Sequence, residues 1–180
     1  MRQQISIYLI VAAASAALVF GQSQSSNSST RISSADRRFM DKAAQGGMAE
    51  VKLGQLAQEK GSSPAVKDFG KRMVTDHSKA NDQLKNIASQ KGVNLPGAID
   101  AKDQATYDRL SKLSGSEFDN EYMRDMVKDH QMDVNEFRHE QQTAKDTDVK
   151  SFAQQTLPTL EQHLSLAQQT TSQIGTTSRK

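Results

Sequence analysis

Four long segments of this chain carry apolar or small residues at spacings of three and four, and this periodicity constrains the fold more than any other feature. Such spacing places those residues on one face of an α-helix, which must then be buried against other helices. The segments are residues 34–60, 64–91, 116–143 and 147–174, and a short helical piece is predicted near residues 107–113. The sequence therefore predicts an all-α protein.

Residues that favour helix starts lie at the beginning of several segments. Ser33 precedes Asp36 in a capping-box-like arrangement, and Ser116 precedes Asp119 at the same spacing. Pro64 suits the first helical position because proline lacks the amide proton that would be unpaired there. A proline inside the last segment, Pro158, is expected to kink its helix.

The lengths of the connections predict how the helices are arranged. The connections that follow residues 60 and 143 are too short for anything but antiparallel neighbours, whereas residues 93–115 can run the full length of a bundle. A faint repeat, AVKDFG from Ala65 and DVKSFA from Asp148, is consistent with two similar hairpins. We therefore expect residues 33–174 to form a ferritin-like four-helix bundle, with two antiparallel hairpins joined by a long crossover.

The first 21 residues, MRQQISIYLIVAAASAALVFG, are typical of a secretory signal peptide, with one positive charge followed by an apolar run and small residues. An uncleaved anchor helix is the alternative, although the run is shorter than the roughly 20 residues that span a bilayer. Residues 22–32 and 175–180 are polar and are expected to be a disordered tether and tail. The chain has no cysteine, so it would fold without disulfides in a periplasmic or secreted location.

The charges of the chain are balanced, with 23 lysines and arginines against 21 acids, and the two signs are interspersed. No basic stripe with stacking aromatic residues is visible, so nucleic-acid binding is not expected. Stable membrane insertion is not expected after removal of the signal peptide, whereas a protein partner or a homo-oligomer remains open. The sequence contains no nucleophile elbow and no glycine-rich phosphate loop, which favours a role other than an enzyme without deciding the question.

Each predicted long helix interrupts its apolar stripe with one ionisable residue near its midpoint: Glu50, His77, His130 and His163. Because all four lie near the middle of their helices, we expect them to meet at one height in the core. Neutral imidazoles and a carboxylate are ligands that suit one zinc, iron or copper ion. A dry hydrogen-bond network, in which Glu50 accepts from the imidazoles, explains the same pattern, and so does a shifted helical register.

Acidic residues lie close to these histidines in the sequence, at Asp76, Asp129 and Glu161. Adjacent residues on a helix point in different directions, so each acid is expected to accept a hydrogen bond from a ligand histidine of a neighbouring helix rather than from its own. The alternative is that all three are solvated acids at the edges of their helices. Glu136 and His139 have the spacing of a di-iron ligand pair, but they lie off the stripe and no second copy exists, so a di-iron centre is not expected.

Three stretches of the chain together resemble a known family: GGMAEVKLGQLAQEKGSSPAVKDFGKRMVTDHSKANDQL, LSGSEFDNEYMRDMVKDH and LPTLEQHL. The family is domain-of-unknown-function family 4142, a bacterial exported family of ferritin-like bundles often labelled outer-membrane proteins. The resemblance runs from about Phe39 to Ala167 and implies an exported ferritin-like bundle, but no activity. The residues that match the family motifs are Glu50, Asp76, His77, Phe118, Asp119, Asp129, His130, Leu157, Pro158 and His163.

These observations lead to three hypotheses about function. The first is an exported bundle that binds or senses one transition metal through the three histidines and Glu50. The second is a structural or partner-binding module of the cell envelope, in which the polar layer only fixes the register of the helices. The third is a metal-dependent oxidoreductase with an open coordination position, which requires a substrate pocket that the sequence does not reveal.

Overall fold

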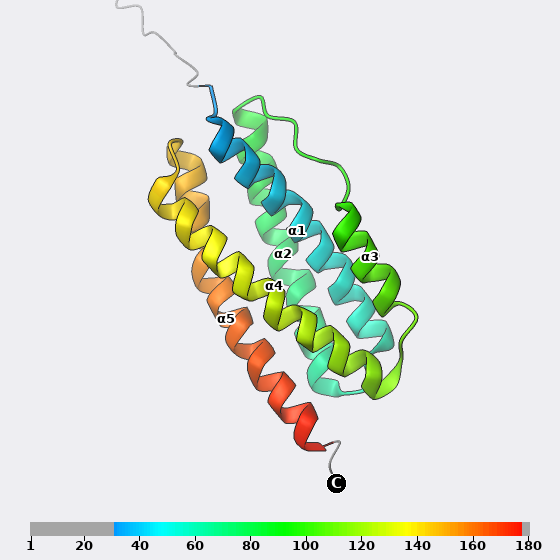
Figure 1. Ribbon diagram of the computed structural model, residues 1–180. Helices are drawn as coiled ribbons and strands as arrows, with labels where there is room; N and C mark the ends of the chain where they lie inside the picture. Colours follow the sequence, from blue (N-terminus) through cyan, green and yellow to red (C-terminus); the bar gives the residue numbers. More distant parts are fainter. Residues whose placement is uncertain (1–30, 178–180) are drawn as a thin grey trace, which may run out of the picture.

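The computed structural model describes residues 31–177, which form five α-helices (Figure 1). The helices are α1 (Ser34–Lys60), α2 (Pro64–Gln90), α3 (Ala101–Leu110), α4 (Gly115–Thr143) and α5 (Thr147–Thr177). The prediction of an all-α protein is confirmed, and the four long helices agree closely with the predicted segments. The predicted signal peptide at residues 1–21 and nearly all of the predicted tether at residues 22–32 lie outside the described residues.

The four long helices form a bundle in which α1 packs against α2 and α4 packs against α5. Contacts between α2 and α5 and between α1 and α4 close the bundle. The segment between α2 and α4 carries α3 and runs along the outside of the bundle from one end to the other (Figure 1). Helix α3 touches α1 and α4, so the core that holds the candidate site is built by α1, α2, α4 and α5.

Two buried aspartates tie the hairpins together. Asp36, in the first turn of α1, accepts hydrogen bonds from the backbone amides of Lys145 and Asp146 in the α4–α5 connection. Asp119, in the first turns of α4, accepts from the backbone amides of Ser62 and Ser63 in the α1–α2 connection. Each hairpin therefore holds the loop of the other, and hydrogen bonds to a charged carboxylate are among the stronger ones in proteins.

The apolar core consists of two separate clusters, one toward each end of the bundle. One cluster includes Phe39, Leu84 and Phe137, and the other includes Phe69 and Met126. Along every long helix the predicted polar residue lies between the positions that belong to the two clusters. A buried polar layer therefore separates the two halves of the hydrophobic core, as the interrupted stripes predicted.

Two glycines let α1 and α2 approach each other closely. A Cβ atom on Gly70 would lie 2.7 Å from the Ala57 Cβ and 2.7 Å from the Gly54 carbonyl oxygen. One on Gly54 would lie 2.6 Å from the Gly70 carbonyl oxygen. The absence of side chains at these positions therefore brings the two helix backbones together.

Three local predictions differ from the structure. The short helix covers Ala101–Leu110 rather than residues 107–113, because Asp100 caps it by accepting from the Asp103 amide. Helix α4 begins at Gly115 after Ser114, so Ser116 is not its N-cap, and the acid of the expected capping box binds the neighbouring loop instead. Pro158 lies inside α5, which continues to Thr177, beyond the predicted end at residue 174.

Candidate metal centre

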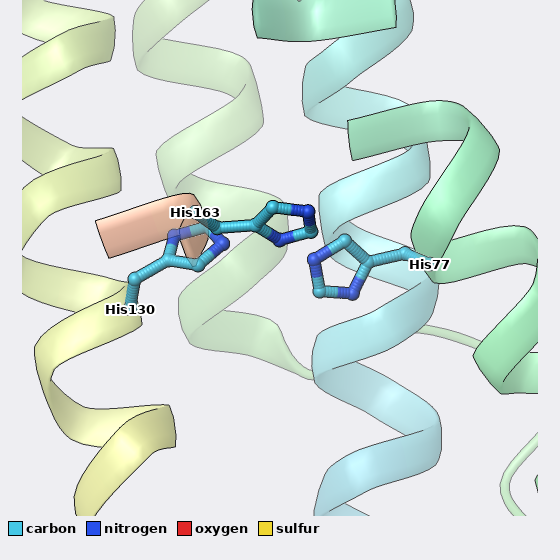
Figure 2. Close-up of side chains that lie close together, drawn as sticks. All are labelled: His77, His130 and His163. Carbon is cyan, nitrogen blue, oxygen red and sulfur yellow. The ribbon is translucent and has the colours of Figure 1, made fainter. Parts of the chain in front are cut away.

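Three histidines from three different helices meet in the polar layer. His77 comes from α2, His130 from α4 and His163 from α5, and their rings point toward one another (Figure 2). The ring centroids are 5.8 Å apart for His77 and His130, 5.4 Å for His77 and His163, and 5.3 Å for His130 and His163. One nitrogen from each ring lies within 4.8 Å of the other two. The structure thus brings together all three histidines that the sequence singled out.

Hydrogen bonds fix which nitrogen of two of these rings carries the proton. Nδ1 of His130 lies 3.0 Å from the Met126 carbonyl oxygen, which can only accept, so Nδ1 donates and Nε2 keeps its lone pair. Nε2 of His163 lies 2.8 Å from Asp76 Oδ2 and donates to that carboxylate, which leaves the lone pair on Nδ1. Each ring is therefore oriented by one nitrogen, and the other nitrogen is available as a ligand.

One nitrogen of each ring in this cluster lacks a partner. His77 Nε2, His130 Nε2 and His163 Nδ1 are all buried and have no hydrogen-bond partner among the described residues. A buried polar atom left without a partner costs about 1 to 3 kcal/mol, which is a large share of the stability of a domain. One unsatisfied nitrogen on each of three converging rings is the arrangement that a metal ion would satisfy.

The environment keeps the imidazoles neutral. Burial lowers the pKa of His77 well below its usual range, and the neighbouring histidines lower it further. Burial is also the main cause that lowers the pKa of His130 to about 4. The pKa of His163 is lowered by burial, although the bond to Asp76 opposes this effect. At neutral pH protons therefore do not compete for the lone pairs, and neutral imidazole is the form that binds metals.

The nitrogen separations are slightly wider than in a metal complex. Nitrogen–metal bonds of about 2.0 to 2.1 Å place two ligand nitrogens at most about 4.2 Å apart. The ligand nitrogens of the three rings are up to 4.8 Å apart, so the rings must turn inward when an ion binds.

Glu50, the predicted fourth ligand, lies beside the histidine cluster and is not part of it. Its carboxyl group is fully buried, and Oε1 is 4.0 Å from His130 Nδ1, the nitrogen that donates to Met126. Burial raises the pKa of Glu50 well above its ordinary value, and the nearby Asp129 raises it further. The structure therefore places this carboxyl group behind the ring of His130, away from the nitrogen that has its lone pair free.

The three acids predicted to support the histidines have different surroundings. Asp76 on α2 binds His163 on α5, so this acid does reach a histidine of a neighbouring helix. Asp129 lies near the buried carboxyl of Glu50 instead. Glu161 is exposed and pairs with Arg138 across 2.6 Å. Of the acids next to the histidines in the sequence, Asp76 is thus the one that orients a ring of the cluster.

A pocket of about 230 Å³ opens beside the cluster between α2 and α5. Two of the histidines, His77 and His163, line it together with polar side chains that the sequence analysis did not single out, including Lys79, Gln83 and Thr159. These residues lie on the polar sides of their helices, and no motif marks them. Their position next to the histidines depends on the packing of α2 against α5, which the sequence does not reveal.

Comparison with known proteins identifies a family for most of the chain. The profile of the domain of unknown function DUF4142 matches residues 21–170. No curated protein matches the sequence. Among residues 31–177, no helix combines the length and the apolar character of a membrane-spanning segment.

Several solved structures have a similar fold. A DUF305 fragment from Deinococcus radiodurans has a TM-score of 0.70 at 14% identity and covers 79% of this chain and 98% of its own. A candidate secreted DUF305 protein from Streptomyces coelicolor has a TM-score of 0.68 at 12% identity, with 78% and 92% covered. CopM in its Cu(II)-bound form has a TM-score of 0.66 at 15% identity, with 77% and 96% covered. CopM is also known in Cu(I)-bound and Ag-bound forms.

Proposed function

The chain belongs to the DUF4142 family, and we propose that it binds one transition-metal ion in its core through His77, His130 and His163. The single observation that carries the proposal is the convergence of three buried imidazoles, each with an unpartnered nitrogen. Their lowered pKa values keep the lone pairs free at neutral pH. Metal binding would give each of these nitrogens the partner that the protein does not supply.

Copper is the metal that we propose first. Imidazole nitrogen suits copper, zinc, iron and nickel, and among divalent ions of this row copper binds a given nitrogen site most tightly. The fold is shared with CopM, whose structures hold Cu(I), Cu(II) or Ag. Zinc and iron, the other two metals that the sequence analysis considered, are the comparison metals for the experiment below.

In this proposal Asp76 orients the ligand His163. A carboxylate that accepts from the far nitrogen of a metal-bound histidine fixes its tautomer and raises its basicity. Asp76 is positioned for this role by its 2.8 Å contact with Nε2. Glu50, by contrast, would have to leave the Nδ1 side of His130 to bind the ion, so we propose that it neighbours the centre rather than completing it.

The second candidate function is a partner-binding envelope module whose polar layer only fixes helix register. A hydrogen-bond network of this kind satisfies its own members. In the layer, His130 donates a hydrogen bond to a backbone carbonyl and His163 donates one to Asp76. Three of their ring nitrogens lack partners among the described residues. These unsatisfied atoms favour metal binding over a purely structural layer.

We further propose that the protein acts outside the cytoplasm, in a periplasmic or secreted location, and that its helices have ferritin-like connectivity. The support for export is the signal-peptide pattern of the first 21 residues and the similar fold of a candidate secreted DUF305 protein. The support for the connectivity is the segment that carries α3 along the outside of the bundle between the two hairpins.

Thermal melting of the purified protein tests the proposal. Copper, zinc or iron should each be added to metal-free protein, because a ligand that binds only the folded state raises the melting temperature. We expect copper to give the largest increase and a chelator to reverse it. A melting temperature that none of the three metals changes would contradict metal binding. A variant, His77→Leu, that folds and loses the increase would connect it to the cluster.

A further inference from the structure

We propose that a small anionic ligand from solution completes the coordination of the metal, and that it binds in the pocket between α2 and α5. This inference rests on the proposed function, because it requires an ion at the three histidines. It goes further by assigning a fourth position to a molecule that the protein does not provide, and by naming the chemical class of that molecule.

The first step is the number of protein ligands. Within the described part of the chain, the histidine cluster contains three residues with converging ligand atoms. Zinc sites with three protein ligands are typically completed by a water molecule or a substrate, whereas closed structural sites have four protein ligands. A centre built from His77, His130 and His163 alone therefore has at least one position to fill.

The second step is that the neighbouring carboxylates are used elsewhere. Asp76 binds Nε2 of His163, while the unpartnered nitrogen of this ring is Nδ1. Glu50 approaches Nδ1 of His130, while the unpartnered nitrogen of that ring is Nε2. Each acid thus contacts the nitrogen that faces away from the proposed ion, so neither is placed to occupy the fourth position.

The third step is the pocket itself. It reaches His77 and His163 and measures about 230 Å³, less than the roughly 300 to 1,000 Å³ of pockets for drug-sized ligands. A second cavity that reaches His77 measures about 40 Å³ and is lined in part by Phe39, Phe137 and Phe152. The unpartnered nitrogens of His77 and His163 are buried, so the inward turn of the rings that ion binding requires must also open the ion to a pocket. The larger, polar pocket is the one with room for a ligand of a few atoms.

The fourth step is charge. Three neutral imidazoles leave the full charge of a divalent ion uncompensated, and Lys79 adds a positive charge to the wall of the pocket. Asp76 also lines the pocket, but its carboxylate already accepts a hydrogen bond from His163. The balance favours an anion that binds through one atom, such as hydroxide, a halide, azide or a thiolate.

The experiment uses azide as the probe and protein loaded with Cu(II). Loaded protein is desalted and its copper is measured, so a failure to load contradicts the proposed function before azide is added. Azide is then titrated while the absorption spectrum and the electron paramagnetic resonance spectrum are recorded. We expect a saturable change in both spectra while copper stays on the protein. An unchanged spectrum in loaded protein, or release of the copper by azide, would overturn the inference and leave metal binding intact.

Two variants connect the azide site to the pocket. Thr159→Phe fills the pocket from α5, and Gln162→Phe adds the same ring at an exposed position of the same helix. We expect Thr159→Phe to weaken azide binding about tenfold or more, and Gln162→Phe to leave it unchanged. Lys79→Gln adds no bulk and provides a second test should Thr159→Phe not fold. We expect Lys79→Gln to weaken azide binding by a few fold. Equal azide affinity in wild type, Thr159→Phe and Lys79→Gln would place the ligand elsewhere and refute the assignment.

Discussion

Nε2 of His163 on α5 donates a hydrogen bond to Oδ2 of Asp76 on α2 across 2.8 Å. This contact joins the two hairpins of the bundle at the height of the polar layer. It also leaves Nδ1 of His163 free to face the other two histidines. The orientation of this ring, and with it the geometry of the cluster, thus depends on a residue of a different helix.

Replacing this acid should weaken metal binding without unfolding the protein. We expect Asp76→Ala to lower the affinity for copper about 10- to 100-fold, the usual effect of losing such a partner. Asp76→Asn should have a smaller effect, because its amide oxygen still accepts from Nε2. The matched control is Glu161→Ala, since Glu161 is close to His163 in sequence but pairs with Arg138. Copper titrations of the three variants make the comparison, and equal losses for Asp76→Ala and Glu161→Ala would contradict the role of the contact.

The metal-free protein should lose stability on acidification through His130. Burial lowers the pKa of His130 from 6.5 to about 4, so below pH 6.5 the unfolded chain binds a proton that the folded protein does not. Stability therefore falls as the pH drops through this window, by an amount on the order of 3 kcal/mol for this group. His130→Phe removes the titrating group. The stability of this variant relative to wild type should therefore be higher at pH 5 than at pH 7. Urea unfolding with a chelator present measures this difference, and a difference that does not change with pH would contradict the prediction.

Glu50 has the opposite dependence on pH. Its pKa is raised, mainly by burial, so above the unfolded value of 4.5 the folded protein holds a proton that the unfolded chain has lost. Stability contributed by this group is present below pH 4.5 and is lost as the pH rises toward the folded pKa. Glu50→Gln should therefore gain stability relative to wild type as the pH rises above 4.5. Urea unfolding of both proteins at pH 4 and pH 7 measures the gain, and an equal difference at the two pH values would argue against a buried, protonated carboxyl.

The same variant tests whether Glu50 is a ligand. Because its carboxyl group lies on the Nδ1 side of His130, we expect Glu50→Gln to bind copper with wild-type affinity in a titration. Glu140→Gln serves as a control, since Glu140 is a buried acid outside the histidine cluster. A large loss of copper affinity in Glu50→Gln alone would favour a centre with four protein ligands.

The contact between α1 and α2 should tolerate no side chain at Gly70. In Gly70→Ala the new Cβ would lie 2.7 Å from backbone and side-chain atoms of α1, so the helices would have to separate. We expect a loss of about 1 to 3 kcal/mol in the free energy of unfolding, as for other overpacked cores. Gly46→Ala is the control, because nothing lies within 4 Å of the new atom, and it should stabilise α1 by about 0.5 to 1 kcal/mol. Denaturant unfolding measures the free energy of unfolding of both variants. Similar values for Gly70→Ala and Gly46→Ala would rule out a steric clash at Gly70.

The sequence predicts the layer of buried polar residues because it interrupts four apolar stripes. Helical periodicity gives the face of each residue, and the position along the helix gives its height in the bundle. These two quantities place Glu50, His77, His130 and His163 in the core at a similar level, where the structure has them. They do not give the direction of each side chain within the layer, and for this reason the separation of Glu50 from the histidine cluster is not predictable from spacing.

The contacts between helices are also beyond the reach of sequence patterns. Asp76 and Asp129 directly precede a histidine and Glu161 lies two residues before one, yet the three acids have different neighbours. Asp76 contacts His163, Asp129 lies near Glu50, and Glu161 pairs with Arg138. The rotation of each helix against its neighbours decides among these outcomes. The same limit applies to α3, which lies outside the four-helix core and carries no long apolar stripe that would mark its boundaries.

The stoichiometry of copper on the desalted protein tests the central claim most directly. Metal-free wild type and the variant His130→Phe should be incubated with excess copper, passed through a desalting column and analysed for copper and protein. The account predicts one copper ion per chain for wild type and none for His130→Phe, with both proteins folded. Wild type without copper, or equal copper on both proteins, would contradict a metal centre formed by His77, His130 and His163.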